Sequence, residues 1–201
     1  PNDHVNYGQS TNDVIPTAGK ITALKLLSKA IEKLTKLNKA LEEKAEEFDD
    51  VIKMGRTQMQ DAVPIRLGQE FNAYSSVIKR DISRIEKSKK ELEFVNMGGT
   101  AVGTGINTDK KYFDLIVPAI NNVMNMELKQ AEDLIDATQN LDGFVSVSAA
   151  IKTCAINLSK MSNDLRLMSS GPRTGFEEIN LPPKQNGSSI MPGKVNPVIP
   201  E

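Results

Sequence analysis

The chain has 201 residues, 39% hydrophobic and 25% charged, which is the ordinary balance of a globular protein with one large core. Its formal net charge of -1 argues against a nucleic-acid or membrane-surface partner, and no apolar run reaches the ~20 residues of a membrane span. A single cysteine and a single histidine exclude an intrachain disulfide and disfavour a Cys/His metal site, so we expect a reducing compartment, the cytoplasm.

Near the start of the chain lies a polar segment, Asn6–Pro16, which we expect to be a loop. Within it, Ser10, Thr11 and Asn12 present two hydroxyls and an amide just before a helix. A helix start offers free backbone N–H groups and a partial positive charge, so this loop could receive a carboxylate. A helix cap combined with an Asx turn explains the same residues and, from this loop alone, is the favoured interpretation.

Three segments carry apolar residues at alternating steps of three and four, the period of long helices packed at shallow angles in a bundle. Each helix is expected to span about 25–32 residues, or roughly 40–48 Å. Their opposite faces also carry apolar residues, so we expect a homo-oligomer whose subunits share an elongated bundle. The three seams are Leu24, Leu27, Ile31, Leu34, Leu41, Ala45 and Phe48; Leu67, Phe71, Tyr74, Ile78, Ile85 and Leu92; and Val147, Ile151, Cys154, Leu158, Met161, Leu165 and Met168.

A second polar loop, Gly55–Pro64, precedes the second seam. Thr57 and Gln58 place hydroxyl and amide donors beside a helix start. A pair between Arg56 and Asp61 that fixes the loop is the structural alternative, and both interpretations can hold together.

Glycine then fills four of the eight positions of Gly98–Gly105, which permits close backbone approach but lacks a phosphate-binding fingerprint. A shorter helix is expected at about Lys110–Asn125, with Pro118 kinking or dividing it. No strand pattern of any length is seen apart from short apolar pieces such as Val51-Ile52, and Met54–Pro64, Asn96–Asp109 and Gly171–Pro200 are all predicted to be loops.

The last loop, Gly187–Pro197, concentrates groups that can carry chemistry. Ser188 and Ser189 offer hydroxyls, one of which could act as a base if its anion were stabilised. Lys194 supplies a cation and Asn196 an amide donor, both set between prolines.

This last loop resembles the signature of the aspartase/fumarase superfamily, and the three earlier loops follow in that family's order and spacing. Met54–Phe71 and Val198–Glu201 resemble the aspartase branch. The resemblance implies an all-α fold in which residues 1–201 form the central helical-bundle domain, with the family's N-terminal and C-terminal domains lying outside this chain. It also implies a homotetramer whose active sites combine loops from three subunits.

For the chemistry, the resemblance implies that Ser188 removes the proton beside a carboxylate of L-aspartate, so that ammonia leaves and fumarate forms. It implies no metal and no organic cofactor. Gln58 stands where fumarases generally have His, which leans toward loss of ammonia over loss of water. The residues implied to bind substrate are Ser10, Thr11, Asn12, Thr57, Gln58, Ser189, Lys194 and Asn196.

Two alternatives stay open. A fumarate hydratase-like enzyme would use the same fold and the same base. A bundle that serves only for oligomerisation would need no active site, and this segment by itself lacks a threonine loop that the family's N-terminal domain supplies.

Overall fold

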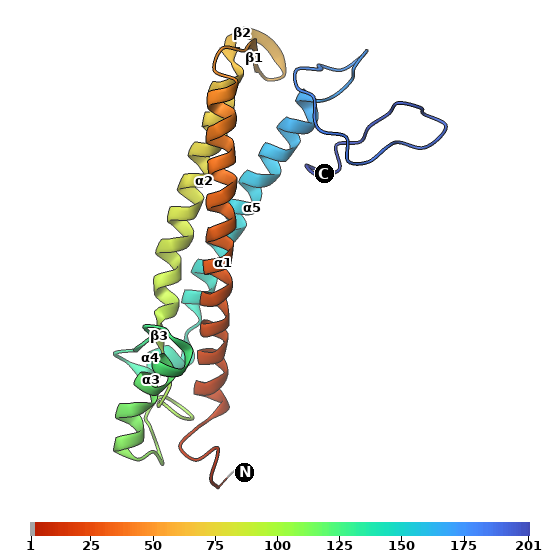
Figure 1. Cartoon of the computed structure of the whole chain (residues 1–201). Coiled ribbons are helices and arrows are strands. Elements are labelled where there is room, and N and C mark those ends of the chain that lie inside the picture. Colours follow the sequence, from red (N-terminus) through yellow and green to blue (C-terminus); the bar gives the residue numbers. More distant parts are fainter. Residues whose placement is uncertain (1–2) are drawn as a thin grey trace. The chain divides into compact units, whose positions relative to one another are not determined.

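The computed structural model of the chain describes residues 3–201, and α-helices dominate it (Figure 1). The longest helices are α1 (Thr11–Glu47), α2 (Leu67–Lys89) and α5 (Asp142–Met168), of 37, 23 and 27 residues. The all-α fold class is therefore confirmed. Shorter elements are α3 (Lys110–Met124), α4 (Leu134–Gln139) and a 3-10 turn, η1 (Lys90–Glu93).

The prediction that Met54–Pro64 is a loop was wrong, and of the short apolar piece Val51-Ile52 only Ile52 belongs to a strand. Strands β1 (Ile52–Thr57) and β2 (Gln60–Arg66) pair antiparallel, and a short parallel pair joins β3 (Phe94–Val95) to β4 (Lys129–Gln130). Most side chains of β1 and β2 are exposed, so the hairpin carries no apolar alternation that a sequence pattern could reveal. Pro64 within β2 is tolerated because this two-stranded sheet consists of edges.

The chain divides into two compact units, and the division falls within α1, α2 and α5. Unit 1 comprises residues 1–35 and 81–151, and unit 2 comprises residues 36–80 and 152–201.

In unit 1, buried aliphatic side chains from the long helices meet others from η1, β3, α3 and α4. Leucine, isoleucine, valine and methionine supply nearly all of this core, as the scarcity of aromatic residues requires. Its members include Leu24, Leu27, Ile85, Leu92, Val95, Met97, Val117, Leu134 and Val147.

In unit 2, the second seam lies against both other long helices. The Phe71 ring packs against the Phe48 ring at a tilt of 57°, with 5.5 Å between centroids, and Tyr74 meets Phe71 edge-on at 5.8 Å. A Cβ at Gly68 would lie 2.3 Å from the Ala45 carbonyl oxygen, so α2 can start this close to α1 only with glycine there. The core includes Leu41, Leu67, Phe71, Tyr74, Ile78, Cys154, Met161 and Met168.

Burial tests the seams residue by residue. All six residues of the second seam are buried. In the third seam alternate members are buried, starting at Val147, while Ile151 between them stays 47% exposed. A helix face that is apolar but uncovered within one chain is what the predicted shared bundle requires.

Two prolines lie inside helices rather than at their ends. α1 begins at Thr11, so the prediction of a loop as far as Pro16 was wrong. Pro16 has no N–H for the Asn12 carbonyl, and Asn96 Nδ2 donates to that oxygen at 3.0 Å instead. α3 likewise runs on through Pro118 without being divided.

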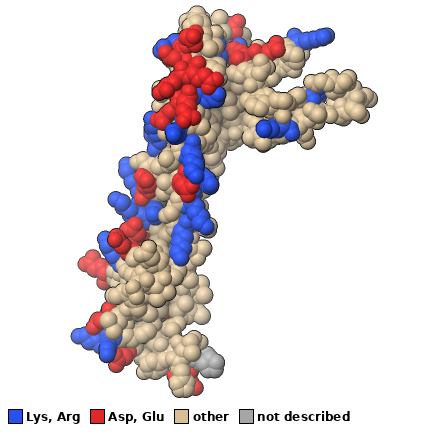
Figure 2. All heavy atoms as spheres, viewed as in Figure 1, with Lys and Arg blue, Asp and Glu red and all other residues tan. Residues whose placement is uncertain are grey.

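Side chains of both charges are scattered over the face drawn in Figure 2, in keeping with the net charge of -1. The last turns of α1 carry Glu42, Glu43, Glu46 and Glu47, and Figure 2 shows acidic side chains gathered over that end of the helix.

Candidate active site

The first polar loop of unit 1 ends in a capping box. The Ser10 hydroxyl accepts the N–H of Asn12 at 3.2 Å, while the Asp13 carboxylate accepts the N–H of Ser10 at 3.0 Å. The helix-cap interpretation is therefore confirmed. Because the Ser10 hydroxyl is used here as an acceptor, its own proton is still free to be donated to a carboxylate.

The glycine-rich loop of unit 1 holds this cap from the other side. Asp13 accepts the N–H groups of Gly98 and Thr100, and Asn12 Nδ2 donates to the Ala101 carbonyl at 2.7 Å. Thr11 and Asn12 are exposed, whereas Asp13 is fully buried. The glycine-rich loop, to which the sequence assigned no role, thus supports the first predicted substrate-binding loop, Ser10–Asn12.

In unit 2, Gln58 and Met59 form the two-residue turn between β1 and β2. Both have positive φ, +51° and +61°, as a type I′ hairpin turn requires. The usual residues for such a turn are Asn and Gly, so the Gln-Met pair hides it from the sequence. Arg56 pairs with Asp61 across the hairpin, with Nε 3.7 Å from Oδ1, which confirms the structural alternative for this loop.

Behind the turn, unit 2 buries a cluster of charges. Lys53 Nζ lies 2.8 Å from Glu70 and 3.2 Å from Glu178, and Arg56 Nη2 donates to Glu178 at 2.8 Å. Burial acts to raise the pKa of Glu178, but hydrogen bonds from Arg56 and Lys53 outweigh it and hold the pKa below its ordinary value. The Arg56 guanidinium also lies 4.0 Å from the centroid of the Phe176 ring. The cluster ties β1 and α2 to the segment that leads toward the serine loop.

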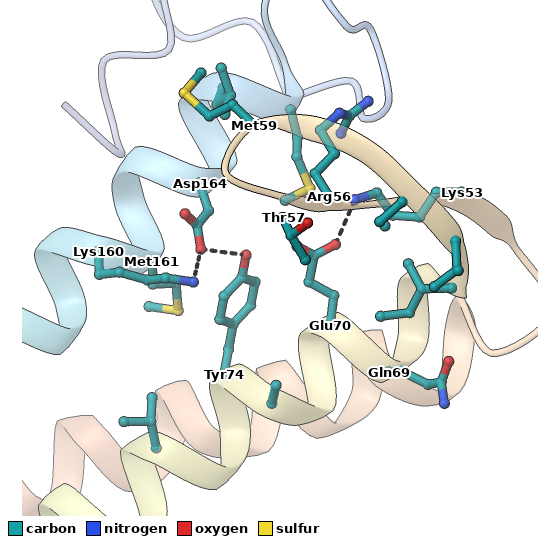
Figure 3. Close-up of a pocket in the computed structure, with 18 of the residues that line it drawn as sticks. Lys53, Arg56, Thr57, Met59, Gln69, Glu70, Tyr74, Lys160, Met161 and Asp164 are labelled. Atoms are coloured by element: carbon teal, nitrogen blue, oxygen red, sulfur yellow. Dashed lines mark hydrogen bonds and ion pairs between the residues drawn. The ribbon is translucent and has the colours of Figure 1, made fainter.

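A cavity of about 810 Å³ opens between the hairpin, α2 and α5 of unit 2 (Figure 3). Thr57 lines it, together with Tyr74, whose hydroxyl donates to Asp164 at 3.0 Å; Lys160 pairs with the same carboxylate. Burial, and then the negative charges of Glu70 and Asp164, raise the pKa of Tyr74 well above its ordinary value. A tyrosine held protonated in this way is a hydrogen-bond donor and cannot act as a base.

The serine loop, Gly187–Pro197, closes on itself through its backbone. Gly187 donates its N–H to the Lys194 carbonyl at 2.6 Å, and Met191 donates to the Ser188 carbonyl at 2.9 Å. Asn196 donates its backbone N–H to Gln185 at 3.1 Å. A Cβ at Gly187 would lie 2.9 Å from Lys194 Cβ, so glycine is needed at the start of this hairpin.

The groups of the serine loop that the resemblance singles out are largely uncovered. Ser188, Ser189 and Lys194 are exposed and Asn196 is half-buried. The Ser188 hydroxyl is therefore reachable from solvent in this structure.

The structure sorts the predicted residues into separate places. Ser10, Thr11 and Asn12 belong to unit 1; Thr57 and Gln58 share the hairpin of unit 2, and the other four lie on the serine loop of that unit. Of the nine, Thr57 alone lines the cavity of Figure 3. The roles that the resemblance implies for them stay predictions.

Several polar residues that shape these places were missed from the sequence. Tyr74 was assigned to the core because it sits on a seam, and nothing local marks its hydroxyl as paired. Lys160 and Asp164 are four apart on α5, which is a visible signal for a helix pair. The contacts of Asp13 with Gly98 and Thr100, and of Lys53 with Glu178, join residues far apart in sequence and carry no such signal.

Residues 3–201 contain no group of three His, Cys, Asp or Glu side chains arranged to hold a metal ion. In the same range, every helix is too short or too polar to cross a membrane.

A family model described as lyase matches residues 1–201. The chain belongs to this lyase family. It is 57% identical to an aspartate ammonia-lyase of Bacillus subtilis and 51% identical to one of Escherichia coli, in each case over its whole length. It spans 42% of the length of each of these relatives.

Solved structures of the same superfamily match as well. A fumarate lyase:delta crystallin of Brucella melitensis, bound to cobalt, superposes with a TM-score of 0.94 at 49% identity. The chain described here covers 44% of that protein's chain. A class II fumarase of Schistosoma mansoni gives a TM-score of 0.90 at 38% identity, with 45% of that chain covered. The resemblance to the aspartase/fumarase superfamily is confirmed.

Proposed function

We propose that the protein to which this segment belongs is an aspartate ammonia-lyase, which removes ammonia from L-aspartate reversibly to give fumarate. The observation that carries the proposal is the level of identity, 51–57% across all 201 residues, to proteins named aspartate ammonia-lyase. The intact serine loop and Gln58 support the same assignment.

The chemistry explains why these residues are needed. A C–H beside a carboxylate is a very weak acid, and removing its proton loads a second negative charge onto that carboxylate. Lys194 and Asn196 would stabilise this enediolate-like species as its charge develops, and Ser188 would take the proton. Loss of ammonia from the neighbouring carbon then leaves fumarate.

The exposed position of Ser188 bears on how it becomes a base. A serine alkoxide forms only beside N–H groups or positive charge, and a loop that closes over substrate also excludes water. We therefore propose that Ser188 is activated by groups that reach it when its loop closes or when subunits assemble.

We propose further that residues 1–201 form the central domain of a cytoplasmic homotetramer with composite sites. The wide separation along the chain of Ser10–Asn12, Thr57–Gln58 and the serine loop fits such a site, because each loop lies at a different helix end.

A fumarate hydratase-like enzyme is the second candidate. The likeness to a class II fumarase at a TM-score of 0.90 favours it, since the two reactions share a fold and a base. Gln58 weighs against it, because an amide cannot transfer a proton at neutral pH.

The deciding experiment measures fumarate formation by the full-length enzyme from L-aspartate and from L-malate in parallel. Activity on aspartate alone supports the proposal, activity on malate alone moves the protein to the hydratases, and activity on neither leaves a bundle that serves assembly.

Ser188→Ala is expected to lower kcat by about a thousandfold or more with assembly intact. Ser159→Ala, at an exposed serine on α5, is the matched control; near-normal turnover by Ser188→Ala would refute the base assignment.

A further inference from the structure

Asp13 is a carboxylate for which the proposed mechanism has no use, yet it is fully buried beside the first substrate-binding loop. Its Oδ1 accepts the N–H of Ser10 at 3.0 Å. Its Oδ2 accepts the N–H groups of Gly98 at 3.2 Å and Thr100 at 2.9 Å. Three backbone N–H groups and the positive end of α1 thus compensate a charge that no water reaches.

The glycine-rich loop that supplies two of these N–H groups has little freedom to move. Gly98 has φ +97°, and a Cβ there would lie 3.2 Å from the Phe113 ring. A Cβ at Gly103 would lie 2.4 Å from the Leu134 carbonyl oxygen, so the loop packs directly on the start of α4. Residues 95–100 are all buried. The loop is therefore a fixed support against which another segment can be held.

Two further hydrogen bonds join the same segments. Asn12 Nδ2 donates to the Ala101 carbonyl at 2.7 Å. Asn96 Nδ2 donates to the Asn12 carbonyl at 3.0 Å, filling the place left by the missing N–H of Pro16. The carbonyl and the side-chain amide of Asn12 are therefore held by residues 96–101, and the backbone of Ser10 is held indirectly, through Asp13.

We propose that Asp13 is a positioning residue for substrate binding: it locks the Ser10–Asn12 loop onto the glycine-rich loop so that Thr11 and Asn12 face the substrate in one orientation. The inference rests on the proposed function of that loop. Asp13 is fully buried and does not itself touch substrate. A small displacement of the groups it holds is enough to weaken binding strongly.

The first test is Asp13→Asn in the full-length enzyme. An amide has the same size but presents an NH₂ group to N–H donors, so at least one of the three hydrogen bonds is replaced by repulsion. The Michaelis constant for L-aspartate is expected to rise roughly tenfold or more. Thr17→Val is the matched control, because Thr17 is buried one helical turn further along α1 and its hydroxyl has no partner within residues 3–201. A Michaelis constant for Asp13→Asn as close to wild type as that of Thr17→Val would overturn the proposal.

A double variant separates positioning from a general loss of structure. If Asp13 acts through the loop that contains Asn12, then Asn12→Ala combined with Asp13→Asn is expected to raise the Michaelis constant by less than the product of the two single effects. Multiplying effects would mean that Asp13 supports the fold independently of the loop, and would overturn the proposal.

A third measurement follows the two loops directly by hydrogen exchange. In the wild-type full-length protein, hydrogen exchange is followed with and without fumarate. Positioning predicts that fumarate slows exchange at the amides of Gly98 and Thr100 together with those of residues 10–13, because the two loops are locked to each other. Protection confined to residues 10–13 would overturn it. If wild-type enzyme forms fumarate from neither L-aspartate nor L-malate, and fumarate protects neither loop, the proposed function is refuted. The contact of Asp13 with the glycine-rich loop can then still be tested without ligand, because Asp13→Asn is expected to speed exchange in both loops together.

Discussion

Tyr74 shows how a single side chain can serve two environments. Its ring is buried in the second seam of unit 2, edge-on to Phe71, while its hydroxyl reaches Asp164 at the wall of the cavity in Figure 3. The apolar spacing predicted the first contact but not the second, because a seam specifies only that a residue faces inward. Asn38 of α1 is similar: it is buried on the helix that carries the first seam, and its side-chain oxygen accepts a hydrogen bond from the buried Ser75 hydroxyl at 2.9 Å.

The raised pKa of Tyr74 makes stability depend on alkaline pH. In the unfolded chain a tyrosine ionises near pH 10, whereas in the folded chain burial and the nearby carboxylates keep Tyr74 protonated. Above about pH 10 the unfolded chain therefore binds fewer protons, and the free energy of unfolding falls as pH rises; below that pH the contribution is fully present. Tyr74→Phe is expected to flatten this fall and to lower stability at neutral pH by about 1 kcal/mol. Denaturant unfolding at about pH 9 and about pH 11 measures both effects, and an identical slope for the two proteins would contradict the assignment.

At the scale of elements, the helices were predictable and the hairpin was not. The long helices could be predicted because apolar residues recur at steps of three and four, a pattern that does not depend on which apolar residue fills each position. The hairpin depends on positive φ at Gln58 and Met59, and on Gly55, where a Cβ would lie 2.7 Å from the Val63 carbonyl oxygen. Non-glycine residues in that conformation carry strain of about 1 kcal/mol each, which surrounding contacts must offset. The buried ion pairs of Lys53 and Arg56 lie directly behind the turn.

Two glycines in equivalent helix positions make a matched prediction. Gly68 and Gly143 are each the second residue of a long helix. A Cβ at Gly68 would lie 2.3 Å from the Ala45 carbonyl oxygen, whereas one at Gly143 would meet its nearest neighbour at an ordinary 3.5 Å. Gly68→Ala is expected to lower the free energy of unfolding by about 2–3 kcal/mol through overpacking. Gly143→Ala is expected to leave it unchanged or raise it by about 0.5 kcal/mol. Thermal and denaturant unfolding compare the two, and equal effects would show that the close contact does not constrain α2.

At the scale of the whole molecule, the proposed oligomer needs apolar residues that this chain leaves uncovered. Ile151 and Ile156 of α5 are 47% and 60% exposed although they belong to a helix whose alternate seam residues are buried. A surface of this kind on a long helix is typical of a bundle completed by further subunits.

We therefore expect Ile151→Asp to weaken assembly of the full-length protein. A charge placed in an apolar interface must be desolvated without a partner, so the variant is expected to sediment as smaller species at concentrations where wild type is a single oligomer. Lys152→Asp, at the exposed neighbouring position, is the control and should leave sedimentation unchanged. An oligomer unaffected by Ile151→Asp would mean that this face stays open to solvent.

The sequence by itself determined the helical class, the three seams, the family and the loops that carry its signature, because apolar spacing and local residue types are properties of short stretches of chain. It determined the cap at Ser10 for the same reason, since a capping box spans four residues. Tertiary structure alone decided that Asp13 binds Gly98 and Thr100, that Glu178 joins Lys53 and Arg56, and that Asn96 takes the place of the N–H that Pro16 lacks. Those contacts join residues 80 or more positions apart, and their formation depends on long-range packing that no local pattern encodes.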